Sequence, residues 1–376
     1  MQKINVLYIV HDTNGWGGAA KSLCNLISSV QDYVNPIVLA RSEGDFTEYL
    51  KTLNIQYLVY PFQILQTTNS KFEYYKHFPK LFISYIKNEI KTTRNLIKIL
   101  KPYKIDIVHS NASIFTIGHY IAKELHVKHV WHIREYLDLD FNIRVIGGRK
   151  RLTHFINKAD ARIAISTSVA NHWHIKNKNS YIIGNAVRKK TEAEYNPTKN
   201  KFILFCAAYI TPNKGASFCV EAFLKSEIYK KGYTLIMYGR CDENYKSQLY
   251  KLAQEYNAVP FIQINEFTEN LKDIYTTATA YIMSSKYEAM GRVTIEAMFY
   301  GCPVIARNSG GTTDFVKHNK TGYLFETLEE CVSLIQEVVN KDNYSIIKNA
   351  LEFVKDNYSE DVYGSKIMNV YKPLIY

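Results

Sequence analysis

The sequence predicts an α/β protein made of two doubly wound domains, each a parallel sheet with crossover helices. Short apolar runs of strand length alternate with helix-length segments along the whole chain, a pattern typical of parallel sheets. The 376 residues are more than one ordinary core accommodates, which favours two domains. A polar, lysine-rich stretch at 185–201 carries a proline and precedes a new strand, so it marks the boundary between the domains.

The apolar runs that we expect to form strands are distributed over both halves. In the first half they lie at 4–10, 35–40, 55–60, 105–110, 127–133 and 161–166. In the second half they lie at 201–209, 233–239, 260–265, 280–285 and 302–307. Open α/β sheets bind ligands beyond the carboxyl ends of their strands, so motifs that follow strands are the candidate site. With two such domains facing each other, we expect the ligand in a cleft between them.

The composition is that of a globular protein with an excess of positive charge. Hydrophobic residues make up 47%, and 47 basic against 35 acidic residues give a net charge of +12. This charge favours an anionic partner: nucleic acid, an acidic membrane face or a phosphorylated ligand. No run approaches the ~20 apolar residues of a membrane span, and the first residues do not resemble a secretory signal. The six cysteines contain no C-x-x-C pair, so we expect reduced thiols in a cytoplasmic protein.

The segment SSKYEAMGRVTIEAMFYGCPVIARNSGGTTDF, at 284–315, is the most informative. Glu288 and Glu296 stand eight residues apart, with a strand ending near Ser285 and a helix beginning near Gly291. This arrangement aims the first amides and the positive end of the helix at an anion. The two carboxylates then accept hydrogen bonds from hydroxyls on either side, which describes a nucleotide sugar. The alternative is a surface helix with two solvated glutamates.

Here the chain resembles the retaining glycosyltransferases of the GT-B fold, and within them glycosyltransferase family 4. The E-x7-E signature of that family is matched by Glu288 and Glu296, and it continues into EAMFYGCPVIA and a GGTTD loop. The resemblance implies that Glu288 holds hydroxyls of the donor sugar and that Glu296 holds those of the ribose. It also implies that Gly291, Arg292 and Val293, at the start of the helix, bind the donor.

The resemblance covers essentially the whole chain, and it implies two Rossmann-like domains that face each other across a cleft. Residues 1–185 would form the acceptor-side domain, and residues 186–359 would form the domain that binds the nucleotide sugar. Residues 360–376 would return to the first domain as a helix. The resemblance implies no metal ion and no other cofactor, because the nucleotide sugar is a substrate.

A lysine loop follows the first strand of the second domain, in AAYITPNKGASF (207–218). It resembles the family stretch in which an arginine and a lysine bind the donor diphosphate. Lys214 supplies the lysine at a loop-to-helix turn suited to a phosphate. The arginine position is held by Tyr209, and Arg292 is the residue that we expect to compensate. Taken alone, Lys214 would equally suit a surface lysine beside a glycine turn.

In the first domain, VWHIREY (130–136) places His132 at the end of a strand. The enzymes that the chain resembles carry a histidine at the equivalent strand end, near the donor sugar and the reacting carbon. We therefore expect His132 to be catalytic alongside Glu288 and Lys214. His109 also ends a strand, and we expect it to shape the wall of the cleft.

The stretch HDTNGWGGAAKSL (11–23) contains a second phosphate-binding pattern. Gly15 and Gly17 begin a G-x-G-x-x-A match, the spacing of a dinucleotide-binding turn. However, four residues separate the preceding strand from Gly15, and Arg41 follows the next strand where an NAD site carries an acid. An NADP site stays open as an alternative. The chain resembles the family's first glycine loop more closely, which implies that Gly17 and Gly18 let the backbone approach the diphosphate and the acceptor.

Asp138 and Asp140 have the D-x-D spacing that binds Mg²⁺ or Mn²⁺ in glycosyltransferases of the GT-A fold. Two aspartates one residue apart arise easily by chance, and the pattern of strands is wrong for that class. We therefore expect no metal site here.

The segment KLFISYIKNEIKTTRNLIKILK (80–101) predicts a basic amphipathic helix. Its apolar residues share one face, and they are Ile83, Ile86, Ile90, Ile97 and Leu100. Its lysines and arginine share another face. We expect the apolar face to pack on the sheet, and contact with an anionic bilayer is a further partner that the charge allows.

The sequence thus predicts a retaining glycosyltransferase that moves a hexose-type sugar from a nucleotide sugar, expected to be a UDP-sugar, to a glycan acceptor. EAMGRVTIEAM and WHIRE resemble bacterial enzymes of capsule, O-antigen or exopolysaccharide assembly. This resemblance implies a lipid-linked oligosaccharide acceptor, no nucleic-acid partner, and a cytoplasmic protein at the inner face of the cell membrane. Three alternatives stay open: a GT-B-type UDP-sugar epimerase or hydrolase, an NADP-dependent reductase, and a non-catalytic protein that binds sugar nucleotides or nucleic acid.

Overall fold

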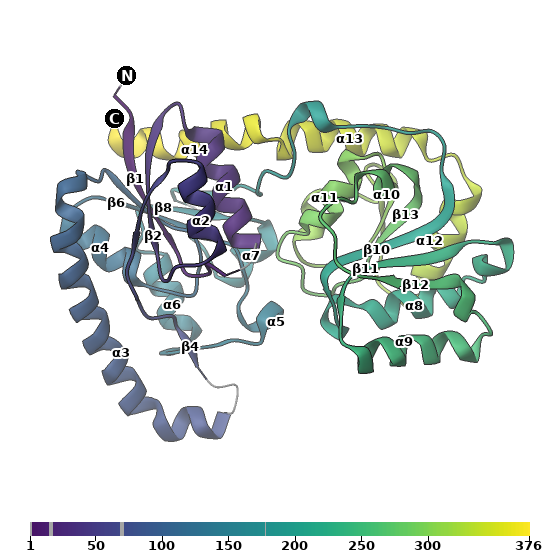
Figure 1. Ribbon diagram of the computed structural model, residues 1–376, viewed down its shortest axis with the longest axis horizontal. Coiled ribbons are helices and arrows are strands. Elements are labelled where there is room, and N and C mark those ends of the chain that lie inside the picture. The colour runs from purple at the N-terminus through teal and green to yellow at the C-terminus, as the bar shows by residue number, and fades with distance from the viewer. Residues whose placement is uncertain (1, 15–17, 68–70, 177) are drawn as a thin grey trace. The chain divides into compact units, whose positions relative to one another are not determined.

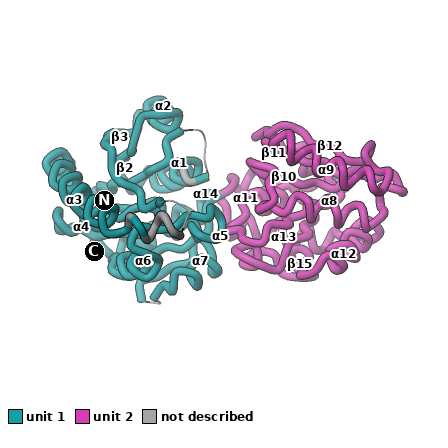
Figure 2. Tube along the Cα trace, turned by 90° about the horizontal axis from the view of Figure 1, so that it is seen from below, with its two compact units in different colours: residues 1–186, 360–376 teal, residues 187–359 magenta. Residues whose placement is uncertain are grey.

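The computed structural model describes residues 2–14, 18–67, 71–176 and 178–376, and the chain forms two compact units. Unit 1 comprises Met1–Ala186 and Glu360–Tyr376, and unit 2 comprises Val187–Ser359 (Figures 1 and 2). Each unit contains a parallel sheet flanked by helices. The prediction of a two-domain α/β fold with parallel sheets is therefore confirmed.

In the described residues of unit 1, seven strands form a sheet with the order β3-β2-β1-β5-β6-β8-β9. These strands are β1 (Ile4–Val10), β2 (Val34–Ala40), β3 (Gln56–Val59), β5 (Ile107–Ser110), β6 (Lys128–Ile133), β8 (Ala161–Ala164) and β9 (Ser180–Ile182). Neighbouring strands are parallel throughout, so their carboxyl ends lie at one edge. The strand order reverses between β1 and β5, and open α/β sheets bind ligands at such a switch point.

Helices cover both faces of this sheet, and a short antiparallel pair, β4 (Gln66–Thr67) with β7 (Arg144–Val145), stands apart from it. The helices are α1 (Gly18–Val30), α2 (Asp45–Thr52), α3 (Lys71–Leu100), α4 (Ile117–Leu125), α5 (Asp138–Phe141), α6 (Gly148–Ile156), α7 (Thr167–His172) and α14 (Glu360–Ile375). Among the described residues, no helix combines the length and the apolar character that crossing a membrane requires.

The last helix, α14, completes the core of unit 1. It packs beside α1 (Figure 1), and the buried side chains Tyr363, Ile367 and Tyr371 join those of α1, β1 and β2. A Cβ at Gly364 would lie 2.2 Å from the carbonyl oxygen of Ser29, so the two helices approach closely because this position has no side chain. The segment 360–376 is thus a structural part of the first α/β unit.

The described part of unit 2 carries a six-stranded parallel sheet with the order β12-β11-β10-β13-β14-β15. Its strands are β10 (Asn200–Ile210), β11 (Thr234–Cys241), β12 (Ile262–Asn265), β13 (Ala278–Met283), β14 (Val304–Arg307) and β15 (Tyr323–Phe325). Its helices are α8 (Ala216–Lys225), α9 (Glu243–Glu255), α10 (Lys272–Thr277), α11 (Arg292–Phe299), α12 (Leu328–Asn340) and α13 (Tyr344–Tyr358). The core on one face joins β10, β11 and β13 to α8, α9 and α12.

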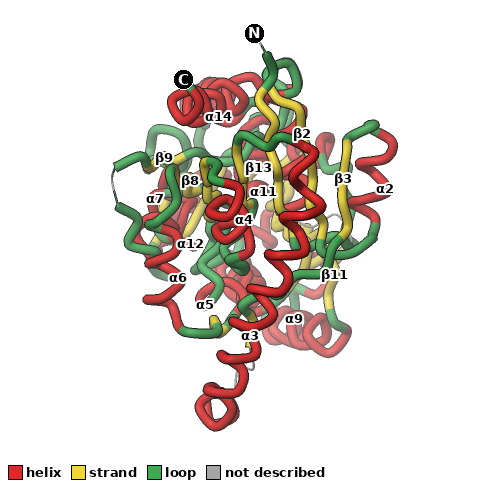
Figure 3. Tube along the Cα trace, turned by 90° about the vertical axis from the view of Figure 1, so that its left-hand side faces the viewer, coloured by secondary structure: helices red, strands yellow, loops and turns green. Residues whose placement is uncertain are grey.

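Every strand expected from the sequence is present, with small shifts at the ends. The sequence pattern does not predict β4, β7, β9 or β15, each only two or three residues long. Runs this short contain too few residues for a periodic pattern. One of them, β9, extends the sheet of unit 1 beyond β8 (Figure 3).

Candidate active site

Three loops meet at the carboxyl edge of the sheet in unit 2. They follow β10, β13 and β14, which are neighbours in the strand order and run parallel. The first loop carries Lys214, the second carries Glu288, and the third carries the glycines of GGTTD. The edge therefore brings together side chains that lie far apart in the sequence.

Lys214 and Glu288 form an ion pair at this edge. The Nζ atom of Lys214 lies 2.8 Å from Oε2 of Glu288. The lysine side chain is 41% exposed and the glutamate side chain is 18% exposed, so water reaches both groups. The pair therefore offers an ammonium group for a phosphate beside a carboxylate for a hydroxyl.

The lysine loop is fixed to the end of β13. Gly215 has a left-handed φ of +73°, and a Cβ there would lie 2.6 Å from the carbonyl oxygen of Ser284. The Ser284 hydroxyl donates to the carbonyl of Gly215 at 2.8 Å and to that of Lys214 at 3.2 Å. Only glycine allows this close approach without strain, so Gly215 positions Lys214.

The GGTTD loop holds the backbone of Glu288. The amide of Gly311 donates to the Glu288 carbonyl at 2.7 Å. At Gly310, φ is +66° and a Cβ would lie 2.5 Å from the same carbonyl oxygen. The Ser309 hydroxyl donates to the carbonyl of Lys286 at 2.9 Å. The double glycine therefore brings the third loop against the second and fixes the position of the carboxylate.

Gly291 is the N-cap residue directly before α11, and it has a left-handed φ of +91°. A Cβ at Gly291 would lie 3.3 Å from Cγ of Glu288, so the helix start and the carboxylate are adjacent. Arg292 and Val293 form the first turn and are partly buried. Glycine offers no side-chain cap, and the positive end of the helix dipole adds to the first amides. This start has the features of an anion site.

Glu296 lies further along α11, where it contacts an arginine that no sequence motif indicates. Arg188 Nη2 lies 3.5 Å from Glu296 Oε1, and the two side chains are 29% and 16% exposed. The guanidinium of Arg188 also lies over the Tyr300 ring, 5.8 Å from its centroid. Arg188 belongs to the lysine-rich stretch at the domain boundary, where it looks like ordinary linker charge.

Tyr209 stands at the position of the family arginine, and the guanidinium of Arg240, in the neighbouring strand β11, contacts it. Tyr209 in β10 pairs in register with Arg240 in β11. Arg240 Nη1 donates to the Tyr209 hydroxyl at 3.1 Å, and the guanidinium lies 5.6 Å from the ring centroids of Tyr209 and Phe267. Among the described residues, Arg240 forms no ion pair with a carboxylate. Arg240 could have been found only from the register of β10 and β11, and a sequence pattern does not reveal that register.

In unit 1, His132 belongs to β6 and is fully buried. Its Nδ1 lies 3.2 Å from Arg134 Nη2, and its Nε2 has no hydrogen-bond partner among the described residues. Burial, with further effects of Arg134 and His109, lowers the pKa of His132 well below its usual range. The imidazole is therefore neutral. The His109 ring lies nearby in a tilted arrangement, with ring centroids 5.4 Å apart, and its Nδ1 lies 2.6 Å from the Tyr371 hydroxyl.

Arg134 and Glu135, which follow His132, are buried as well. Arg134 donates to Asn111 Oδ1 from Nε at 3.0 Å and from Nη2 at 2.7 Å. Glu135 accepts the backbone N–H of Ser113, and burial raises the pKa of Glu135 to about 7. This edge of unit 1 thus holds polar groups in a solvent-excluded network.

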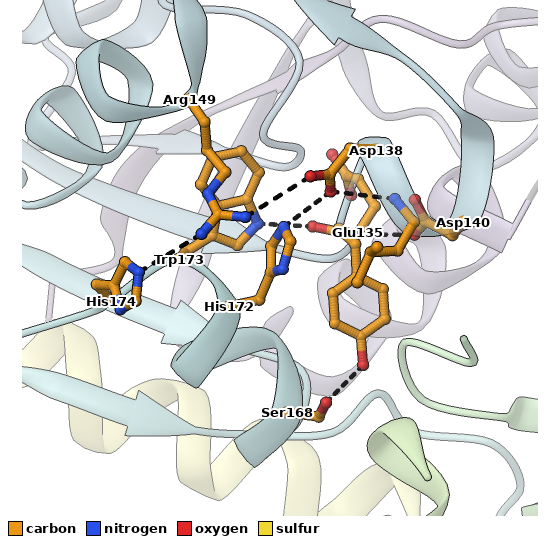
Figure 4. A network of polar contacts seen from close by, with 10 residues as sticks. Glu135, Asp138, Asp140, Arg149, Ser168, His172, Trp173 and His174 are labelled. Atoms are coloured by element: carbon orange, nitrogen blue, oxygen red, sulfur yellow. Dashed lines mark hydrogen bonds and ion pairs between the residues drawn. The ribbon is translucent and has the colours of Figure 1, made fainter. Parts of the chain in front are cut away.

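The D-x-D aspartates of α5 contact residues of α6, of α7 and of the segment before α5 (Figure 4). Asp138 lies 2.8 Å from His172 Nε2 and 3.6 Å from Arg149 Nη1. Asp140 accepts the backbone N–H of Tyr136 at 2.9 Å. In the described part of the chain, no group of three or more histidine, cysteine, aspartate or glutamate side chains is arranged to hold a metal ion.

Of the two glycines expected near the diphosphate, Gly17 lies outside the described residues. Gly18 begins α1 and is exposed, and a Cβ added there would lie more than 4 Å from the atoms of the described residues beyond its chain neighbours and the adjoining helix backbone.

Two family models together match residues 16–353 of the chain. The model described as Glycosyltransferase Family 4 matches residues 16–189, and the model described as Glycosyl transferases group 1 matches residues 187–353. The matches meet where unit 1 passes into unit 2. These matches favour the sugar-nucleotide interpretation over the NADP-dependent reductase.

Curated relatives are similar at low identity. Glycogen synthase 1 of Synechocystis sp. is 26% identical over 183 residues, which are 47% of this chain and 37% of that protein. An uncharacterized glycosyltransferase of Methanocaldococcus jannaschii is 26% identical over 251 residues, which are 64% of this chain and 63% of that protein. The chain thus spans less than two thirds of the length of these relatives.

Solved structures share the fold over the whole chain. The structure of Anabaena HepE in complex with UDP has a TM-score of 0.80 at 16% identity, covering 98% of this chain and 100% of that one. A glycosyltransferase from Rickettsia africae has a TM-score of 0.79 at 19% identity, covering 100% and 99%. With its two parallel-sheet units and these structural matches, the chain has the GT-B fold, its first half matching the Glycosyltransferase Family 4 model and its second half the Glycosyl transferases group 1 model.

Proposed function

We propose that the protein transfers a hexose-type sugar from a nucleotide sugar to a glycan acceptor, with retention of the anomeric configuration and without a metal ion. The observation that carries the proposal is the edge of unit 2 where Lys214, Glu288 and the start of α11 are adjacent. An ammonium group, a carboxylate and first-turn amides are the groups that recognise a diphosphate flanked by hydroxyls. UDP is the proposed nucleotide, because the GT-B protein HepE of Anabaena has been solved with UDP and with UDP-glucose.

The diphosphate is assigned to three positive features of unit 2. Lys214 supplies an ammonium group, and the first turn of α11, with Arg292 and Val293, supplies backbone amides and a side-chain cation. Arg240 supplies a guanidinium beside Tyr209, in the place of the family arginine. An arginine held against two rings keeps its orientation and can donate two parallel hydrogen bonds to a phosphate.

The hydroxyls are assigned to the two glutamates. Glu288, next to Lys214, accepts hydrogen bonds from the donor sugar, and Glu296 accepts them from the ribose. Arg188 limits the rotation of the Glu296 carboxylate through its contact at 3.5 Å. Both carboxylates are partly exposed, so they bind hydroxyls without first leaving a sealed interior.

The chemistry requires stabilisation of the departing nucleoside diphosphate while the sugar gains oxocarbenium character. Positive groups fixed at the leaving phosphate supply this stabilisation without reorganising during the reaction. Attack occurs on the face that the diphosphate leaves, and the leaving phosphate oxygen takes the proton of the acceptor hydroxyl. No side-chain nucleophile enters this scheme, so the configuration is retained through positioning alone.

Unit 1 is assigned to the acceptor side. His132 is proposed to approach the donor sugar, with the unpartnered Nε2 as the atom available to it. Gly17 and Gly18 are proposed to admit the diphosphate and the acceptor at the start of α1. The proposed acceptor is a lipid-linked oligosaccharide of cell-surface polysaccharide assembly. A net charge of +12 favours such an acceptor, because lipid carriers bear phosphate.

A thermal-shift panel tests the donor site. The protein is heated with UDP, GDP, ADP, NADP⁺ or UDP-hexoses in EDTA, and the variants Glu296→Gln and Glu329→Gln are compared. Glu329 is an exposed acid in the first turn of α12, so it controls for the loss of one surface charge. A ligand at 100 times its Kd raises the free energy of unfolding by about 2.7 kcal/mol.

We expect UDP to stabilise the wild type and Glu329→Gln in EDTA, and Glu296→Gln to lose most of that shift. The UDP-hexose that stabilises best is then incubated with glycan acceptors. Formation of a glycoside supports transfer. Release of free sugar or formation of a second UDP-sugar without any acceptor would instead identify a hydrolase or an epimerase. A shift with NADP⁺ alone would overturn the proposal.

A further inference from the structure

Helix α3 buries a different face from the one formed by its isoleucines. Its buried side chains recur every three or four residues, and they are Tyr85, Glu89, Thr93, Leu96 and Leu100. This face packs on α4, and the Thr116 hydroxyl donates to Glu89 Oε1 at 2.9 Å. The expectation that the isoleucine face packs on the sheet is therefore wrong, except at Leu100.

Four isoleucines of α3, Ile83, Ile86, Ile90 and Ile97, form an exposed stripe instead. Ile83 is 55% exposed and Ile90 is 45% exposed, while Ile86 and Ile97 are partly exposed. Their spacing of three, four and seven residues places them in one row along the helix. The N-terminal turns of α3 extend away from the other elements of unit 1 (Figures 1 and 3).

A row of bases runs directly beside this stripe. The exposed basic residues are Lys80, Lys87, Lys91, Arg94 and Lys98. Between Lys76 and Lys101 the sequence contains one acid, Glu89, and it lies on the buried face. In the described part of the chain, none of these five bases forms an ion pair with a carboxylate. This exposed face of α3 therefore has one row of apolar side chains and, beside it, a row of positive charges without acidic partners among the described residues.

We propose that this face of α3 lies on an anionic phospholipid surface. The isoleucines would enter the boundary between headgroups and acyl chains, and the bases would lie at the level of the lipid phosphates. A nucleic acid would engage the bases but leave the isoleucines in water. The combination of both rows therefore favours a membrane as the partner. The proposal goes beyond the transferase reaction, and its geometry involves unit 1 alone.

Co-sedimentation with vesicles tests the proposal. Phosphatidylcholine vesicles are compared with vesicles that contain phosphatidylglycerol as the anionic lipid. The charge variant carries Lys87→Glu, Lys91→Glu and Arg94→Glu. The apolar variant carries Ile83→Ser and Ile90→Ser. A matched control carries Lys225→Glu, Lys320→Glu and Lys348→Glu, which change the net charge equally at exposed positions of unit 2.

We expect the wild type to bind the anionic vesicles and not the neutral ones, with binding weakened by salt. The charge variant should bind at least tenfold more weakly than the matched control, and the apolar variant should also bind more weakly than the wild type. The altered positions are exposed, and unchanged circular dichroism and melting temperature establish that each variant folds.

Three results would overturn the proposal. The wild type could fail to sediment with anionic vesicles, the matched control could lose as much binding as the charge variant, or the apolar variant could bind as well as the wild type. The UDP thermal shift of the charge variant separates the two proposals. If the charge variant keeps a normal UDP thermal shift but does not bind vesicles, the substitutions affect the membrane face of α3 and not the donor site. If the wild type binds vesicles but no nucleotide, the result contradicts the transferase proposal and leaves the membrane proposal standing.

Discussion

The two sheets present different kinds of polar group at their carboxyl edges. In unit 2, Lys214 and Glu288 lie in loops beyond the strands and are partly exposed. In unit 1, His109 and His132 lie within β5 and β6 and are fully buried, and Glu135 is buried just beyond. Burial lowers the pKa of both histidines and raises that of Glu135 to about 7. At these two edges, the accessible ion pair belongs to unit 2, whereas the histidines and the carboxyl of unit 1 are buried where desolvation disfavours their charged forms.

This difference follows from where the polar residues stand relative to the strands. A residue inside a parallel strand is enclosed by the helices that cover the sheet, so its charge is disfavoured by desolvation. A residue in a loop beyond the strand can keep its side chain in water while the backbone of the loop packs closely against its neighbours. In unit 2, Gly215 and Gly310 provide that close packing. An anionic donor is therefore assigned to unit 2, where binding does not require moving a buried charge.

Removing the exposed cation of unit 2 tests the comparison most strongly. We expect Lys214→Ala to lower kcat for sugar transfer on the order of 10²–10³-fold, the cost of deleting one charge-stabilising contact to a leaving group. Steady-state kinetics with the donor from the thermal-shift panel measure the change. Lys320→Ala, at an exposed lysine of the same unit, is the control. Equal rates for the two variants would remove Lys214 from the mechanism.

The buried carboxyls of unit 1 predict a dependence of stability on pH. Burial raises the pKa of Glu89 from 4.5 to about 7. Between these values the folded protein keeps a proton that the unfolded chain loses, so the contribution is full below pH 4.5 and is lost as pH rises through 7. Glu89→Gln should reduce the loss of unfolding free energy between pH 4.5 and 8 by an amount on the order of 3 kcal/mol.

Urea unfolding at pH 4.5, 6 and 8 measures this dependence. Glu48→Gln, at an exposed acid of α2 in the same unit, is the control and should leave the slope unchanged. A variant at Glu89 whose stability changes with pH exactly as the wild type does would show that the carboxyl is not desolvated.

Two glycines of unit 2 sharpen the role assigned to the loops. Gly310 and Gly232 have left-handed φ values of +66° and +83°, so alanine should cost about 1–2 kcal/mol of stability at each. Only at Gly310 would the new Cβ also meet the Glu288 carbonyl, at 2.5 Å, whereas at Gly232 no atom of the described residues lies within 4 Å. We expect both variants to melt earlier and only Gly310→Ala to bind UDP more weakly. Equal UDP affinity in both would contradict the role of the loop.

The smallest expected effect concerns Arg240. Calorimetric titration of Arg240→Ala should show about tenfold weaker binding of UDP, the usual scale of one hydrogen bond to a charged group. Binding of UMP should change less, because UMP lacks the second phosphate. Arg240→Lys, which keeps the charge, should lie between the two. An equal loss for UMP and UDP would assign Arg240 to the nucleoside instead.

The fold and the edge of unit 2 could be predicted because their signals are local. Strand-length apolar runs define β10, β13 and β14, and parallel neighbours end at the same edge. Lys214 and Glu288 follow two of these strands directly, so the pattern alone brings them near each other. Their roles toward a donor rest on the resemblance to family 4 and on the experiments above.

The remaining contacts depend on tertiary packing, which a sequence pattern does not display. Arg240 reaches Tyr209 through the register of two strands, and Arg188 reaches Glu296 only once the boundary stretch is placed against α11. In α3, helical periodicity allows two half-apolar faces. The face that contains Tyr85, Glu89 and Leu96 is the one that packs on α4. There the Thr116 hydroxyl, directly before α4, donates a hydrogen bond to Glu89, so the buried carboxyl has a partner.

The place of α14 has a consequence for the order in which the protein folds. Unit 2 is one continuous stretch, Val187–Ser359, whereas unit 1 is complete only with residues 360–376. Tyr371 of α14 is buried beside Tyr8 of β1, with their hydroxyl oxygens 3.3 Å apart. During synthesis, unit 2 therefore has all its residues while unit 1 still exposes apolar surface to water. The half that is made first is completed last, and its exposed core is where nascent chains are expected to need chaperones.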